Sequence, residues 1–417
     1  MFKKILLKLQ CAIVLLFVVF SWAGLVYGDE QAPEIKAPSA ILVESQRGQV
    51  LYEKDPKARL HISSANKIMT ALLAIEKMEK QLDAKVTVSK KAVSVEGSIL
   101  NLEVGGKYTV EDLVYTVVLT SANDTANALA EFIGGDEKSF VELMNAKAKK
   151  LNMLDTKFTN PTGLYDEAQY TTAYDVALLI RHAIKIPAFD RIFSSNAKPW
   201  TDQNGTQVLV NSNELFFGGY DGVDGGKTGY NERSKHTAIT TATRNNQRLI
   251  CVVLDSPLEN LYGDSVKLLD YGFNNYKTGI LVSKDQPLKR VQIGDEYVDL
   301  ISISDYYYTF PIGENYIKNI EFNISDNLKP PITKKEVLGT SKYTLKDGTV
   351  IEISLYPNTN IYSSVSMLSS LLQKMMNYRE ITILLLILAS VELILILYNI
   401  AKLIKKAFVK LTYKFKS

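Results

Sequence analysis

Residues 64–70 read Ser64-Ala65-Asn66-Lys67-Ile68-Met69-Thr70, and they begin a segment with the periodicity of a helix. A helix with one buried face is predicted because apolar residues recur at helical spacing, namely Ile68, Leu72, Ile75 and Met78. On such a helix Ser64 and Lys67, at positions i and i+3, share a face within hydrogen-bond reach. A serine attacks once a base takes its proton, and a buried lysine with a lowered pKa can be that base. Alone the pattern is weak, because the start of a capped helix explains the same residues.

Two further triplets carry groups that suit the same chemistry. Ser121-Ala122-Asn123 stands between two helical patterns, where the hydroxyl can relay a proton and the amide can hold a carbonyl group. Lys227-Thr228-Gly229 follows three glycines and enters a strand-rich region. Lysine and threonine on a strand suit a carboxylate, and Gly229 permits a ligand to approach the backbone closely.

The three motifs in this order are the signature of the penicillin-recognising serine enzymes. The surrounding sequence resembles one family among them, the D-alanyl-D-alanine carboxypeptidases or low-molecular-weight penicillin-binding proteins, over residues 37–273. The segments that carry the resemblance, besides residues 64–70, are Thr109-Val110-Glu111-Asp112-Leu113, Ser121-Ala122-Asn123-Asp124, Asn160-Pro161-Thr162-Gly163-Leu164, Tyr170-Thr171-Thr172-Ala173-Tyr174-Asp175, Asn211-Ser212-Asn213, Gly222 to Tyr230, and Lys267-Leu268-Leu269-Asp270-Tyr271-Gly272-Phe273. The turn at Asn160 to Leu164 is interpreted as structural.

The resemblance implies catalytic roles for four residues. Ser64 would be the acylated nucleophile, Lys67 its base, and Ser121 with Asn123 the second catalytic element. Ser64 would expel the terminal D-alanine of a peptide, and water would then release the shortened peptide.

The resemblance also implies how substrate is held. Lys227 and Thr228 would bind the terminal carboxylate beside Gly229, and the backbone N–H groups of Tyr230 and Ser64 would form the oxyanion hole. The expected partners are peptidoglycan stem peptides ending in D-Ala-D-Ala, with β-lactams as inhibitors. The resemblance implies that neither a metal nor an organic cofactor is required. The three histidines, His61, His182 and His236, also lack the spacing of metal ligands.

Two positions depart from the family pattern, both near the expected carboxylate site. Ser234-Lys235 replaces the small Ala-Gly pair that relatives usually carry, and Leu261 replaces an arginine. The alternative to a working carboxypeptidase is therefore a catalytically weak, wall-associated structural or penicillin-binding protein. A β-lactamase is disfavoured because no glutamate is identifiable as a deacylating base, and a sensor because about 16 residues follow Ala401.

The predicted fold class is α/β (α+β), a transpeptidase-like domain in which a helical cluster flanks a sheet, followed by a small all-β domain. Residues 40–52 predict a β-hairpin, helices are predicted near residues 140–151, 173–184 and 265–276, and strands at 237–243 and 249–254. Thr109 and Asp112 are expected to cap a helix that continues through Leu119. Cys251 lies in the last of these and is expected to pack in the core. The predicted boundaries are 29–278 for the catalytic domain and 279–362 for an all-β spacer.

The two ends of the chain predict export and anchoring. Residues 1–28 read as a signal peptide, 363–380 as an amphipathic linker and 381–401 as a transmembrane helix. The lysine-rich tail, 402–417, is expected in the cytoplasm with the body outside. The net charge of +3 leaves no extended cationic surface for nucleic acid.

Overall fold

The computed structural model describes residues 32–61, 63, 66–202, 205–233, 235–294, 296–362 and 379–414. The predicted signal peptide, Ser64, Ser234 and residues 363–378 of the predicted linker lie outside this range. The chain divides into two compact units, one that runs to Gly279 and includes Tyr307–Tyr316, and one that holds Ile280–Tyr306 and continues from Ile317.

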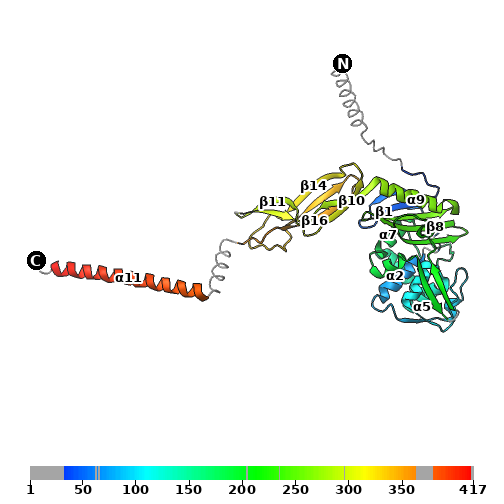
Figure 1. Cartoon of the computed structure of the whole chain (residues 1–417), viewed down its shortest axis with the longest axis horizontal. Coiled ribbons are helices and arrows are strands. Elements are labelled where there is room, and N and C mark those ends of the chain that lie inside the picture. The colour runs from blue at the N-terminus through cyan, green and yellow to red at the C-terminus, as the bar shows by residue number, and fades with distance from the viewer. Residues whose placement is uncertain are drawn as a thin grey trace, which may run out of the picture. The chain divides into compact units, whose positions relative to one another are not determined.

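The sheet of the first unit has five antiparallel strands in the order β2-β1-β9-β8-β7 (Figure 1). The strands are β1 (Ser39–Glu44), β2 (Val50–Lys54), β7 (Val223–Asn231), β8 (Lys235–Arg244) and β9 (Gln247–Ser256). The predicted hairpin and both predicted strands are confirmed. β7, which carries Lys227-Thr228-Gly229, is an edge strand, so one of its sides is left open to other elements.

Strand β9 is apolar on both faces because the sheet is covered on both sides. Ile250, Val252 and Leu254 face the helical cluster, whereas Leu249 and its alternate neighbours face α9 (Leu258–Asn275). Cys251 belongs to the α9 side and is buried, and burial raises the pKa of its thiol. The predicted packing role of Cys251 is therefore confirmed.

The helical cluster packs around α2, whose residues from Asn66 to Ile75 are all buried. Its other helices are α3 (Lys90–Val93), α4 (Val110–Leu119), α5 (Asn123–Gly134), α6 (Glu137–Lys150), α7 (Ala173–Ala183) and α8 (Pro187–Phe193). α2 itself spans Asn66–Met78, and Thr109 caps α4 by accepting from the backbone N–H of Asp112 at 3.0 Å. The helical predictions are confirmed, with α9 beginning at Leu258, well before the expected Ser265.

Three two-stranded sheets of short strands are also present among the described residues. β3 (Lys85–Thr87) pairs with β4 (Lys107–Thr109), and β5 (Ala197–Asp202) pairs with β6 (Gly205–Val210) ahead of a 3₁₀ turn, η1 (Glu214–Phe216). β10 (Tyr276–Val282) and β13 (Tyr306–Pro311) form another two-stranded sheet. The β5–β6 hairpin was not predicted.

The second unit contains a five-stranded sheet in the order β11-β12-β16-β15-β14, which confirms the all-β prediction. Its strands are β11 (Pro287–Ile293), β12 (Glu296–Ile301), β14 (Ile317–Ile324), β15 (Gly339–Leu345) and β16 (Val350–Pro357). A small apolar core that includes Val298, Leu300 and Leu355 holds it together.

The helix α11 (Arg379–Lys414) contains an apolar stretch, Ile383–Lys405, that is long enough to cross a membrane and is not buried against protein. The helix continues through most of the predicted tail. Among the described residues it is the one helix that meets this test.

Candidate active site

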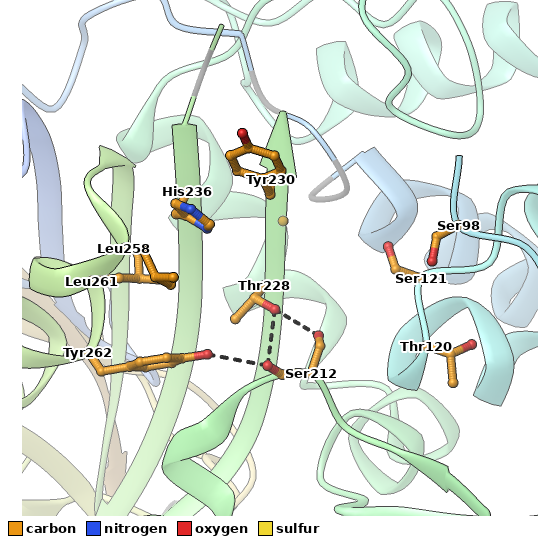
Figure 2. A pocket seen from close by; sticks show the side chains of 11 residues that line it. Ser98, Thr120, Ser121, Ser212, Thr228, Tyr230, His236, Leu258, Leu261 and Tyr262 are labelled. Carbon is orange, nitrogen blue, oxygen red and sulfur yellow. Dashed lines mark hydrogen bonds between the residues drawn. The ribbon is translucent and has the colours of Figure 1, made fainter. Parts of the chain in front are cut away.

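A cavity of about 370 Å³ lies between the edge strand β7 and the loop that enters α5. Figure 2 shows side chains from β7, β8 and α9 on one side, and Ser98, Thr120 and Ser121 on the other. The described residues that line it are Ser98, Thr120, Ser121, Ser212, Thr228, Gly229, Tyr230, His236, Leu258, Leu261 and Tyr262. The second and third sequence motifs are thus brought together across one cavity.

Lys67 is held in the first turn of α2 with 2% of its surface exposed. Its Nζ donates to the carbonyl oxygen of Thr162 at 2.6 Å. Burial lowers the pKa of Lys67 well below its usual value, the positive charge of Lys227 lowers it further, and Asp124 opposes the shift. A lowered pKa makes the neutral amine more accessible than in an exposed lysine, and the neutral amine is the form that a general base requires.

Ser121 joins α4 to α5 in the left-handed region, with φ of 63°. Its Oγ lines the cavity region yet is buried, and it has no hydrogen-bond partner among the described residues. A buried hydroxyl without a partner is costly, which makes Ser121 Oγ a candidate to contact a ligand in the cavity.

Asn123 opens α5 and does not line the cavity in this structure. Its side-chain amide donates to the carbonyl oxygen of Glu96 at 2.6 Å, and its backbone N–H donates to Ser98 at 2.7 Å. The neighbouring Asp124 accepts from the backbone N–H groups of Leu100 and Leu102. Both residues therefore hold the loop that carries Ser98 against the start of α5.

Lys227 is fully buried on β7, and its Nζ donates to the carbonyl oxygen of Thr228 at 2.8 Å. Burial lowers the pKa of Lys227 to about 7. Thr228 points to the opposite face and donates to Ser212 Oγ at 2.8 Å (Figure 2). The position before Lys227 is a glycine, Gly226, because a Cβ there would lie only 2.6 Å from Asn213 Nδ2. Thr228 and Gly229 are the members of this motif that line the cavity.

The turn at Asn160 to Leu164 contributes more than the structural role expected for it. Thr162 supplies the carbonyl that holds Lys67, and the carbonyl of Pro161 accepts from Thr70 Oγ1 at 2.7 Å. Gly163, with φ of 78°, lies so close to the carbonyl of Ser63 that a side chain would collide with it. The family resemblance of the sequence singled out this segment. No pattern in the sequence predicted that its backbone contacts Lys67.

Of the described residues at the two departures from the family pattern, Leu261 lines the cavity and Lys235 does not. Leu261 is 1% exposed and forms an apolar wall together with Leu258. Lys235 is exposed and is not among the described lining residues. Arg233 is engaged elsewhere, because it lies over the ring of Tyr165 at 4.4 Å and donates to its hydroxyl at 2.8 Å.

The proposed nucleophile, Ser64, lies outside the described residues, so its role stays a prediction. Its described neighbours in sequence, Ser63 and Asn66, are both buried. Within the described part of the chain, no group of three or more His, Cys, Asp or Glu side chains is arranged to hold a metal ion.

Residues 28–257 match the model of the D-alanyl-D-alanine carboxypeptidase family, and residues 276–363 match that of the C-terminal domain of penicillin-binding protein 5. The chain is 36% identical to the D-alanyl-D-alanine carboxypeptidase DacF of Bacillus subtilis, with 76% of this chain and 83% of the relative covered. It is 31% identical to DacC of Escherichia coli, with 82% and 89% covered.

Solved structures agree with these sequence matches. Penicillin-binding protein 5 of Haemophilus influenzae aligns with a TM-score of 0.68 and 28% identity, over 79% of this chain and 99% of that one. A peptidoglycan synthesis regulatory factor of Streptococcus pneumoniae, PBP3, aligns with a TM-score of 0.67 and 26% identity, over 79% of this chain and all of that one. With its second and third motifs at one cavity and family models matched over residues 28–257 and 276–363, this chain belongs to the D-alanyl-D-alanine carboxypeptidase family of penicillin-binding proteins.

Proposed function

We propose that this protein is a serine-type carboxypeptidase that removes the terminal D-alanine from peptidoglycan pentapeptides through an acyl-enzyme on Ser64. The observation that carries the proposal is the burial of Lys67, which lowers its pKa in the first turn of α2. The second is Ser121 Oγ, a buried hydroxyl at the cavity without a partner among the described residues.

In the first step, the neutral amine of Lys67 takes the proton of the Ser64 hydroxyl, and the oxygen bonds to the carbonyl carbon of the penultimate D-alanine. The amide C–N bond breaks, and the leaving amine takes a proton through Ser121. In the second step, water attacks the ester, the C–O bond to Ser64 breaks, and the shortened peptide leaves with a free carboxylate.

Substrate is held on the β7 side of the cavity. Thr228, with Lys227 behind it, binds the terminal carboxylate, and the backbone N–H of Tyr230 stabilises the oxyanion together with that of Ser64. Penicillins present a strained amide beside a carboxylate, so they acylate the same serine. In this proposal, the role of Asn123 is to hold the loop that carries Ser98.

The proposal also covers where the enzyme works. Residues 1–28 direct export, the catalytic domain (29–278) and spacer (279–362) stand outside the cell, and residues 381–401 anchor them in the membrane behind the 363–380 linker. Support comes from the apolar, unburied stretch Ile383–Lys405 and from the lysines of residues 402–417.

A catalytically weak, penicillin-binding wall protein is the second candidate. The apolar wall of Leu258 and Leu261 favours it, because that side of the cavity offers no charge to a carboxylate.

The test uses the soluble body, residues 29–377, and a D-Ala-D-Ala pentapeptide. We expect release of D-alanine and a mass increase of one penicillin on incubation with benzylpenicillin, and neither in Ser64→Ala. A Ser64→Ala protein that still gains the adduct would refute the nucleophile. A wild-type protein that is acylated but releases no D-alanine would establish the second candidate.

A further inference from the structure

The imidazole of His236 occupies the part of the cavity between β7 and α9 (Figure 2). Its ring packs against that of Tyr230 in a tilted arrangement, with centroids 4.5 Å apart and planes inclined by 30°. Among the described residues no hydrogen bond to either ring nitrogen is formed, and the side chain is partly exposed. The ring is therefore oriented by its contact with Tyr230, while its nitrogens remain available to a ligand.

The strand register places this ring beside Thr228. Tyr230 lies opposite His236 in the β7–β8 ladder, and Thr228 lies opposite Ala238. Since paired residues and alternate residues share a face, Thr228, Tyr230 and His236 all project from the same side of the sheet. Thr228 and His236 are diagonal neighbours, at a typical separation of roughly 7–8 Å. An anion bound between them can contact both side chains.

His236 is also the one described lining residue that can become positively charged. The other titratable groups of the lining are the phenols of Tyr230 and Tyr262, while α9 adds Leu258 and Leu261. Lys227 lies on the other face of β7, fully buried and bonded to the Thr228 carbonyl. Because burial lowers its pKa to about 7, part of its population is neutral near neutral pH. An anionic ligand in this cavity therefore depends on more than Lys227.

We propose that His236, together with Thr228, binds the terminal carboxylate of the substrate and determines the specificity of the enzyme for a free carboxyl end. Imidazolium N–H groups form charge-assisted hydrogen bonds with carboxylates, about twice as strong as neutral ones. The inference rests on the proposed function. His236 on β8 would supply the charged contact to the carboxylate that Leu258 and Leu261 on α9 do not provide.

The test compares ligands with and without the carboxylate. In His236→Ala we expect kcat/KM for a D-Ala-D-Ala peptide to fall about ten- to a hundredfold, mostly through KM, because one charged hydrogen bond is lost. Acylation by benzylpenicillin should slow similarly. Acylation by benzylpenicillin methyl ester, whose carboxylate is blocked, should change less than about twofold. His236→Arg should restore peptide turnover.

Lys235→Ala is the matched control, since it removes a full positive charge from the adjacent position on β8 but outside the described lining. It should leave every one of these rates unchanged. A loss in Lys235→Ala instead of His236→Ala, or an equal loss of His236→Ala with penicillin and its methyl ester, would overturn the inference. Because the wild type is assayed alongside, failure of the proposed function appears separately, as absence of acylation in the unmodified enzyme.

Discussion

The two sides of the cavity differ in the polarity of their side chains. On the side of the helical cluster, Lys67 and Ser121 are polar groups held in buried surroundings, and burial shifts the pKa of the lysine. On the side of α9, Leu258 and Leu261 are apolar, and the polar contacts come from β7 and β8 instead. We infer that bond cleavage depends on polar groups held in the protein core. Recognition of the carboxylate depends on side chains of the cavity wall, such as Leu261, that can be substituted without disturbing those polar groups. The following experiments test that division.

Lys67→Arg should have the largest effect. A guanidinium keeps the positive charge but stays protonated, so acylation by benzylpenicillin should fall by at least about a hundredfold. The measurement is the acylation rate, with circular dichroism to check that the variant is folded. A folded variant that acylates at the normal rate would eliminate this lysine as the base.

The pH profile of the wild type gives an independent check on the same residue. Because the pKa of Lys67 is lowered in the folded protein, its neutral form is present above that lowered pKa and is lost as pH falls through it. The acylation rate should therefore decrease on the acid side.

Gly163→Ala should disturb the helical side through the backbone. The new methyl group would meet the carbonyl of Ser63 at a positive φ, beside the Thr162 carbonyl that holds Lys67. We expect a loss of about 2–4 kcal/mol in the free energy of unfolding and slower acylation. Denaturant unfolding and the acylation rate are measured together.

Gly135→Ala is its control, because Gly135 has a similar φ of 81° but no atom within 4 Å of the added carbon. It should cost about 1 kcal/mol and leave the acylation rate intact. Equal effects of the two substitutions would show that the contact at Ser63 is unimportant.

Leu261→Arg should have a moderate effect of the opposite sign. A guanidinium on the α9 wall would add a charge-assisted hydrogen bond to the substrate carboxylate, so kcat/KM for the peptide should rise about tenfold or more. The gain should be greater in a His236→Ala background, where none of the other described lining residues supplies a positive charge. A change below about twofold in both backgrounds would show that α9 does not contact the carboxylate.

Removal of residue Ile381 onward should have the smallest effect on catalysis. We expect a soluble protein whose kcat/KM stays within about twofold of the full chain, because the cavity is formed entirely within the first unit. Cell fractionation and the peptide assay measure both quantities. Tight membrane association of the truncated protein would place the anchor elsewhere in the chain.

The sequence by itself determined the family, the helices and most strands. Local patterns were sufficient, because the buried face of α2, the Thr109 cap and the continuous apolar run of β9 depend on residues close in the chain. The all-β texture of the second unit was readable for the same reason. The early start of α9 was missed because Leu258 to Asp264 lacks a side-chain cap in front of it.

Only the tertiary structure decided how the site residues are poised. Lys67 meets Thr162, 95 positions away in the chain, and burial together with the charge of Lys227 lowers the pKa of its amine. His236 carried no motif, and it reaches the cavity because the β7–β8 register sets it opposite Tyr230. A sequence motif shows which chemical groups are present. The pKa of a side chain and its access to the cavity depend on the local dielectric and on neighbours that folding brings from distant segments.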